Sequence, residues 1–439
     1  MDGADADVLV VGAGPAGGAT AIACARAGLS VLVLEKSVAW PRPKPCGDAL
    51  TPRAVRALDE LGVAPGPAWH AIGGLAGYGL SQRPSVFRWP DGVDDLPALC
   101  YVVPRAQLDA AIMRQACALG ARLELGAGVR QLSFDGRGRA DGVELADGRR
   151  LAAPVVVDAS GPSSRLGEQA GMPRRKGWPM GVAARSYVRM APGCGPDPAL
   201  LHSWLALRGT DGTRLPGYGW VFPMGDGLFN VGVGQLSTSA SFRRTDYRDL
   251  LRQFVAALPP EWGLSWVGEP RPTRCCDASG WVAEATGRPV IAGAALPMGF
   301  DRRVAYRHGV LLAGDAAGLV NPFNGEGVSY ALESGLLAGE AIVRAQDAPS
   351  GWGQPASELA LQGYQHALAA RLGGYYRLGR GFARVIAHDA VMRVGMRWVL
   401  PHPVPMRPVN RLMANLLAET GGGPTDRIVR ALSRLSGAV

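Results

Sequence analysis

The chain alternates short apolar runs with glycine- and proline-rich turns, a pattern that predicts many short strands and fewer, longer helices. An apolar run at 8–11 leads through a glycine-rich turn into a helical stretch, and a second apolar run follows at 31–34. Apolar residues recur on one helix face over 105–118, whereas alternation over 122–157 with Asp-Gly turns predicts a meander of strands. The chain therefore opens with a predicted strand–helix–strand unit.

Later residues are rich in strand patterns before they become helical. Strand patterns over 180–236 precede an apolar run at 310–314, and helical periodicity covers 327–346. Residues 355–436 are helical in pattern except for the proline-rich segment 401–408. We predict an α/β fold, in which an interrupted Rossmann-like dinucleotide-binding domain holds an inserted β-rich substrate domain and is followed by a C-terminal helical region.

A glycine fingerprint follows the first strand. Gly12-Ala13-Gly14-Pro15-Ala16-Gly17 comes directly after the apolar run, and Glu35 closes the second strand 23 residues after Gly12. Gly12 suits a tight turn, Gly14 lets a diphosphate approach the positive helix end, and Gly17 lets helix and strand pack closely. Glu35 can accept hydrogen bonds from ribose hydroxyl groups. This unit predicts a bound dinucleotide.

A second motif follows the apolar run at 310–314. Gly314-Asp315 ends that strand, and Asn321–Gly327 leads into the next helix. Asp315 would then reach the ribityl chain of a flavin, and the helix tip would direct N–H groups to the flavin edge that becomes negative on reduction. The two motifs together predict FAD. Because no second fingerprint follows a later strand, we expect the reductant, NAD(P)H or another electron donor, to bind transiently.

Charge is placed unevenly along the chain. The net charge is +9, and the segment from Arg371 to the C-terminus holds eleven arginines against three acidic residues. Arginines beside aromatic residues suit a peripheral contact with an anionic membrane, and a solvated helical face is the alternative reading. No recognition module for nucleic acid accompanies the charge, so we expect no nucleic acid partner.

Composition also bounds location and metal content. The chain has no run of about 18 uncharged apolar residues, so we expect no transmembrane helix. The first strand-like run begins at Asp7, which leaves no room for a signal peptide and predicts a cytoplasmic protein, including the inner face of the cell membrane. The seven cysteines have no metal-binding spacing, so we expect reduced thiols and no metal.

Five segments carry a family resemblance: Lys44–Pro52, Tyr218–Pro223, Asn230–Gly234, Leu296–Phe300 and Gly314–Ser334. In this order, over nearly the whole chain, the sequence resembles flavoproteins of the para-hydroxybenzoate-hydroxylase fold. More narrowly, it resembles the geranylgeranyl reductase family, including bacterial enzymes that saturate the isoprenoid tail of menaquinone.

The resemblance implies roles for individual residues. It implies that Cys46 lies against the flavin beside the substrate double bond and that Arg105 reaches the flavin; the alternative for Cys46 is a small buried apolar residue. Tyr218 and Trp220 share a strand face and are implied to line an isoprenoid pocket, whereas plain core aromatics are the alternative. We predict Cys46, Tyr218 and Trp220 as catalytic residues. The predicted FAD-binding residues are Gly12, Gly14, Ala16, Gly17, Glu35, Lys36, Cys46, Gly47, Arg105, Val129, Gly161, Gly314, Asp315, Gly325, Glu326, Gly327 and Val328.

The expected function is therefore reduction of an isoprenoid C=C bond by hydride from reduced FAD, with Cys46 or water supplying the proton. An FAD-dependent monooxygenase of an apolar or aromatic substrate is the enzymatic alternative, although Ser160 stands where such hydroxylases carry an Asp. A halogenase is disfavoured because flavin halogenases require a lysine beyond the glycine loop, and residues 45–175 contain no lysine. A non-catalytic protein that binds flavin and lipid is the third reading.

The order of the motifs predicts the domain bounds. The FAD-binding domain is expected in three parts, at 1–75, 101–170 and 286–346. The substrate domain is expected at 76–100 and, as an antiparallel sheet, at 171–285. The C-terminal helical region is expected at 347–439.

Overall fold

A six-stranded sheet forms the first layer of the computed structural model, which describes residues 4–80, 83–89, 96–97, 99–209, 211–239, 241–274, 277–349, 351–399, 401–416, 427 and 431. The sheet order is β21-β22-β12-β1-β2-β8, and all neighbours are parallel except β21 and β22. β1 is buried along its whole length, which explains its unbroken apolar run. The strands are β1 (Val8–Val11), β2 (Val31–Glu35), β8 (Arg122–Leu125), β12 (Val155–Asp158), β21 (Tyr306–Arg307) and β22 (Val310–Leu312).

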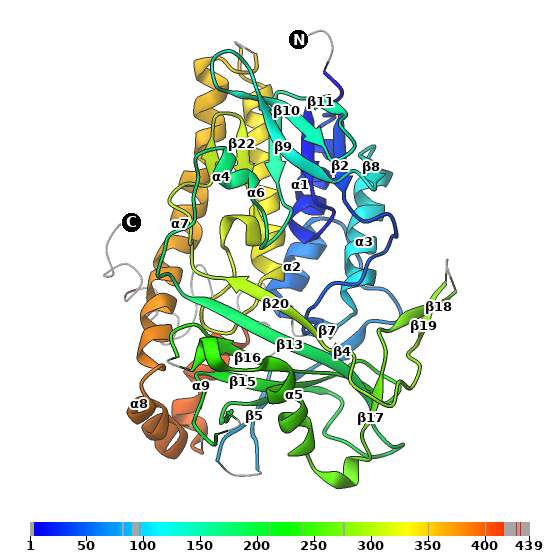
Figure 1. The fold of residues 1–439 in the computed structure, drawn as a ribbon, viewed down its shortest axis with the longest axis vertical. Coiled ribbons are helices and arrows are strands. Elements are labelled where there is room, and N and C mark those ends of the chain that lie inside the picture. Colours follow the sequence, from blue (N-terminus) through cyan, green and yellow to red (C-terminus); the bar gives the residue numbers. More distant parts are fainter. Residues whose placement is uncertain are drawn as a thin grey trace.

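Helices α1, α3 and α6 accompany this sheet, and α1 packs against both of the others (Figure 1). The contact between α1 and α6 is close: a Cβ on Gly335 would lie 2.4 Å from the Ala16 carbonyl oxygen. Arg53 of α2 ties that helix to α6 through a buried ion pair, with 2.5 Å between its Nε and Glu333 Oε1. The helices are α1 (Pro15–Arg26), α2 (Pro52–Glu60), α3 (Arg105–Ala118), α4 (Leu166–Gln169) and α6 (Val328–Gln346); a meander of β9 (Val129–Phe134), β10 (Ala140–Leu145) and β11 (Arg150–Ala152) packs against β12.

A larger sheet forms the second layer, below the first in Figure 1. Its order is β17-β13-β16-β15-β14-β5-β6, and β20 also pairs with β13. The pairs are antiparallel except for β14 with β5. The strands are β5 (Gly74–Tyr78), β6 (Ser85–Arg88), β13 (Met180–Arg189), β14 (Leu200–Trp204), β15 (Gly217–Pro223), β16 (Leu228–Leu236), β17 (Ser265–Val267) and β20 (Ala292–Pro297).

Smaller elements complete the two layers. Helix α5 packs against β13 and β16. A three-stranded sheet of order β3-β7-β4 joins the loop at Cys46 to the start of α3, since Ala49 pairs with Val102. The elements are α5 (Tyr247–Ala256), β3 (Ala49–Leu50), β4 (His70–Ile72), β7 (Cys100–Val102), β18 (Arg271–Arg274), β19 (Asp277–Val282) and the 3-10 turns η1 (Phe242–Arg244), η2 (Pro260–Trp262) and η3 (Gly314–Ala317).

The C-terminal region is helical, as predicted. Its elements are α7 (Pro355–Val385), α8 (Asp389–Val394), the π-helix η4 (Gly395–Val399) and α9 (Pro403–Met413). Helix α7 runs beside α6 and down to the second layer, where α8 and α9 lie (Figure 1). Arg430 and Arg434 of the basic segment lie outside the described residues. Within the described part of the chain, none of the helices combines the length and apolar character needed to cross a bilayer.

The predicted α/β class with a helical C-terminal region is confirmed. One strand departs from the predicted division of the chain: residues 286–346 were assigned to the FAD-binding domain, but β20 within them pairs with β13 over six residues from Met180 to Arg185. β13 thus has β16 on one side and β20 on the other. The segment returns to the first sheet only at β21.

Candidate active site

A cavity of about 520 Å³ lies between the two layers. Gly14, Ala159 and Gly314 line its upper wall, and each follows a strand of the parallel sheet. Ligands of open α/β sheets bind at this carboxyl edge, so the cavity occupies the expected place for a cofactor. The predicted site residues that line it are Gly14, Ala16, Cys46, Gly47, Arg105, Gly161, Tyr218, Trp220, Gly314, Asp315, Gly325, Glu326, Gly327 and Val328.

The glycine fingerprint has the geometry that a diphosphate requires. Gly12 has φ +104°, and a Cβ on Gly17 would lie 1.9 Å from the Gly12 carbonyl oxygen, so both positions need glycine for the turn and the packing. Gly14 differs, because a Cβ there would meet nothing closer than the guanidinium tips of Arg42 and Arg105, at 3.8 and 3.9 Å. No side chain caps the start of α1. Open space over Gly14 and an uncapped helix end fit the diphosphate of FAD.

Glu35 is held as a carboxylate at the end of β2. It accepts hydrogen bonds from the backbone N–H groups of Ala13 (3.2 Å) and Ser37 (3.0 Å) and pairs with Arg42 at 3.0 Å. Burial opposes ionisation, but Arg42 and these hydrogen bonds outweigh it and lower the pKa of Glu35. An ionised Glu35 suits the ribose role. Sequence reasoning missed Arg42, which has no motif of its own.

Five predicted cofactor residues lie outside the cavity wall: Gly12, Gly17, Glu35, Lys36 and Val129. Gly12, Gly17 and Glu35 shape the turn and strand end beside it. Lys36 is exposed, and Val129 packs against the apolar core at the start of β9. A role for Lys36 and Val129 in binding FAD therefore stays a prediction.

The second motif forms the opposite corner of the cavity. Asp315 Oδ1 lies 3.2 Å from the position of a Cβ on Gly327, so the strand end and the start of α6 meet. Burial raises the pKa of Asp315, although the cations Lys44 and Arg105 oppose this shift. Glu326 is fixed from two sides, by Thr51 Oγ1 at 2.8 Å and by Asn415 Nδ2 at 2.8 Å. Asn415, which follows α9, thus supports the flavin motif, a contact that the sequence does not signal.

A hydrogen-bond network holds the loop that carries Cys46. Asn230 Nδ2 donates to the Cys46 carbonyl oxygen and to Asp48 Oδ2, both at 2.8 Å, and Asn230 Oδ1 accepts from Trp220 Nε1 at 2.9 Å. Asp48 also accepts from Tyr187 Oη at 2.7 Å and adopts φ +63°. The buried Asp48 is therefore held in a left-handed turn by its partners, which places the Cys46 thiol on the cavity wall.

The surroundings of the Cys46 thiol favour its protonated form. Burial raises its pKa, and the nearby Arg105 guanidinium lowers it only in part. Arg105 itself is bound by both oxygens of Asp109, each at 3.1 Å. A protonated thiol at this place can donate a proton to a carbon atom in the cavity.

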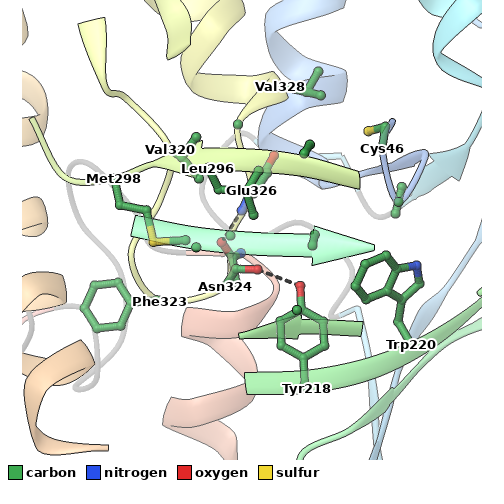
Figure 2. Close-up of a pocket in the computed structure, with 18 of the residues that line it drawn as sticks. Cys46, Tyr218, Trp220, Leu296, Met298, Val320, Phe323, Asn324, Glu326 and Val328 are labelled. Carbon is green, nitrogen blue, oxygen red and sulfur yellow. Dashed lines mark hydrogen bonds between the residues drawn. The ribbon is translucent and has the colours of Figure 1, made fainter. Parts of the chain in front are cut away.

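The two predicted aromatic residues line the same cavity, which confirms that they share a strand face. Their ring centroids are 5.9 Å apart, and Tyr218 Oη donates to the Asn324 carbonyl oxygen at 2.6 Å. Figure 2 shows Trp220 on the side of Cys46, with Met298 and Phe323 at the far side of Tyr218. Beyond them the lining is apolar and includes the side chains Phe382, Ile386, Met392, Met396, Met406 and Met413. The cavity thus joins the dinucleotide corner to a slot between the C-terminal helices.

Comparisons with known proteins agree with this site. A family model described as an FAD binding domain matches residues 5–214. The chain is 35% identical over 435 residues to a menaquinone reductase of Mycobacterium tuberculosis, covering 97% of each chain. It is 32% identical over 349 residues to digeranylgeranylglycerophospholipid reductase 1 of Methanopyrus kandleri, covering 77% of this chain and 80% of that one.

A solved structure shares the fold. It is a geranylgeranyl bacteriochlorophyll reductase-like protein from Thermoplasma acidophilum, with a TM-score of 0.72, 21% identity, and coverage of 97% of this chain and 99% of that one. With the full-length match to the menaquinone reductase, the chain belongs to the geranylgeranyl reductase family and is an FAD-dependent oxidoreductase.

Proposed function

We propose that this chain saturates a C=C bond in the isoprenoid chain of a prenyl lipid, of the menaquinone or geranylgeranyl type. The proposal rests on one continuous cavity. It runs from the glycine corner, the turn at Gly12–Gly17, past Cys46 to a slot lined by methionine side chains. Methionine adapts to irregular apolar ligands, which suits a branched chain. The full-length relative named menaquinone reductase supports the same substrate class.

Different residues would bind the cofactor, align the lipid and donate the proton. Bound FAD would supply the hydride, and the protein would bind and orient the cofactor. Gly14, Asp315 and the start of α6 would hold it, and the apolar slot would align the lipid and exclude water. Cys46 would give its proton to the carbon that does not receive hydride, because its raised pKa keeps the thiol protonated. Trp220, bonded to Asn230, would fix the lipid beside that thiol.

We also propose that the protein contacts an anionic membrane peripherally through its C-terminal helices. Val391 lines the cavity and is 41% exposed, and Val394 and Trp398 nearby are 58% and 61% exposed. Arg397 lies over the Trp398 ring at 5.6 Å. Exposed apolar side chains with an arginine at the end of a lipid slot suit entry of the lipid from a bilayer.

Vesicle flotation tests the membrane proposal. We expect binding to vesicles with anionic lipid and about tenfold weaker binding by a Val394→Glu, Trp398→Glu variant, because two apolar anchors are lost. Leu359→Glu, at a residue 68% exposed on α7, is the matched control and should bind normally. Equal flotation of all three proteins would contradict the proposal.

Lipid mass spectrometry tests the reductase proposal. Cells with the protein should contain a prenyl lipid two daltons heavier per reduced bond than cells without it, and purified protein should produce the same shift under anaerobic conditions. A monooxygenase would stop without oxygen. A protein that neither binds FAD on titration nor changes any prenyl lipid would refute the proposal.

A further inference from the structure

A second cavity lies outside the lipid slot, between residues 171–178 and 303–307. Its lining includes Arg174, Arg175, Lys176, Trp178, Arg303 and Arg307. We call it the basic cavity. Its lining, as far as the structure describes it, contains no acidic residue.

Four of these cations have no carboxylate partner among the described residues: Arg175, Lys176, Arg303 and Arg307. Arg174 is different, because Asp301 binds it with both oxygens, at 2.8 and 2.6 Å. Burial and the charge of Arg303 lower the pKa of Arg175, and burial together with neighbouring arginines lowers that of Arg380 to about 10. The positive charge of the basic cavity is therefore not neutralised within the protein.

Trp178 holds one lining arginine, Arg175, and the neighbouring Arg380 in place. Two guanidinium groups lie over the Trp178 ring. Arg175 is 4.5 Å and Arg380 is 4.0 Å from the ring centroid. Arg380 is fixed further by a 2.8 Å hydrogen bond to the Gly299 carbonyl oxygen. The Nε atom of Arg175 is buried and has no hydrogen-bond partner. A buried donor without an acceptor costs stability, and an anion that reached this atom would supply the acceptor.

The basic cavity adjoins the wall of the flavin site. Arg174, in its lining, donates hydrogen bonds to the carbonyl oxygens of Pro162 at 3.2 Å and Asp315 at 3.0 Å. Both residues also line the flavin cavity. Arg174 therefore connects the lining of the basic cavity to the wall of the flavin cavity.

We infer that the basic cavity binds phosphate groups, and that their source is the nicotinamide dinucleotide that reduces the flavin. Guanidinium groups bind phosphate through paired hydrogen bonds, and the position beside the flavin wall suits a reductant. The cations outnumber the charges of a bridging diphosphate, which favours the dinucleotide with the additional ribose phosphate. The assignment of the reductant rests on the proposed function, whereas phosphate binding does not.

Calorimetry with the FAD-loaded protein tests the inference, using inorganic pyrophosphate, NADPH, NADH and vesicles of anionic phospholipid as separate ligands. We expect saturable binding of pyrophosphate and NADPH, with NADPH bound more tightly than NADH. Arg303→Ala and Arg175→Ala should each weaken both by about tenfold, since each removes a charge-assisted hydrogen bond. Arg175→Lys should recover part of the loss. Arg248→Ala removes an exposed arginine on α5 and should bind normally.

The outcomes separate the two proposals. Absence of saturable pyrophosphate binding, or equal binding by Arg303→Ala and the wild type, would overturn the phosphate site, as would binding to vesicles alone. Binding of pyrophosphate but not NADPH would overturn the reductant as the source. Turnover of the lipid with dithionite in place of the dinucleotide should be unchanged in Arg303→Ala. If the wild type also fails with dithionite, the proposed function is at fault rather than the basic cavity.

Discussion

Replacement of Asn230 by alanine should damage both stability and turnover, because one side chain holds the Cys46 loop. Asn230 is fully buried and makes three hydrogen bonds, to Cys46, Asp48 and Trp220. The variant leaves the Cys46 carbonyl oxygen and the Trp220 N–H without these partners. Two buried groups that lose their bonds cost about 3 kcal/mol together, within the usual range for such groups. Asp48 keeps its bonds from Tyr187 and from the backbone of Arg105.

The loss of turnover should exceed what lower stability explains. A loop that shifts by about 1 Å moves the thiol relative to the lipid, which commonly lowers a rate by about 100-fold. Denaturant unfolding measures the first effect, and anaerobic lipid reduction at a temperature where the variant is folded measures the second. Tyr187→Phe is the graded control: it removes one bond to Asp48 and keeps the ring, so we expect a cost of about 1 kcal/mol. If Asn230→Ala behaves like Tyr187→Phe in both assays, the network does not position Cys46.

Further predictions concern the thiol, the glycine corner and the α2–α6 contact. Cys46→Ala should retain FAD, seen by its absorbance, and lose about 100-fold in turnover, as expected for a lost general acid. A proton donor works only while it is protonated, and burial raises the pKa of Cys46. The turnover of the wild type should therefore fall only above about pH 8.5, and this fall should be absent in Cys46→Ala. Gly14→Ala should fold but bind FAD weakly, whereas Gly17→Ala should fail to fold because its Cβ would lie 1.9 Å from a backbone oxygen; equal flavin content in both would contradict this distinction. Arg53→Met should lower the free energy of unfolding by about 3 kcal/mol, since it leaves the buried Glu333 without its closest partner, and a urea titration measures the loss.

Features that arise from neighbouring residues were predictable from the sequence. The glycine corner and the strand before it lie within ten residues of one another, so their spacing determines their geometry. The same holds for Tyr218 and Trp220, whose shared face follows from strand alternation.

Features that join distant segments were not predictable. The Asn230 network brings together the loop at Cys46, β13 and β16, and the Asn230–Cys46 contact spans 184 residues. The pairing of β20 with β13 was not predicted either, because an apolar strand does not reveal its pairing partner. The basic cavity likewise needs Arg175 and Arg303 together, and only the fold brings the two loops that carry them to one place.

Helix α7 has a mechanical consequence. It spans 31 residues, about 46 Å at the usual rise per residue, and is anchored by Tyr364 to the Leu312 carbonyl oxygen and by Tyr376 to that of Leu319. A helix of this length should limit hinge-like opening of the molecule, and we therefore expect a long lipid to enter the cavity end first. The lipid would stop where its bulky head group meets the opening of the cavity. The distance from that opening to the flavin would then decide which isoprene unit is reduced. Extending the opening by one helical turn should therefore move the reduced bond along the lipid chain.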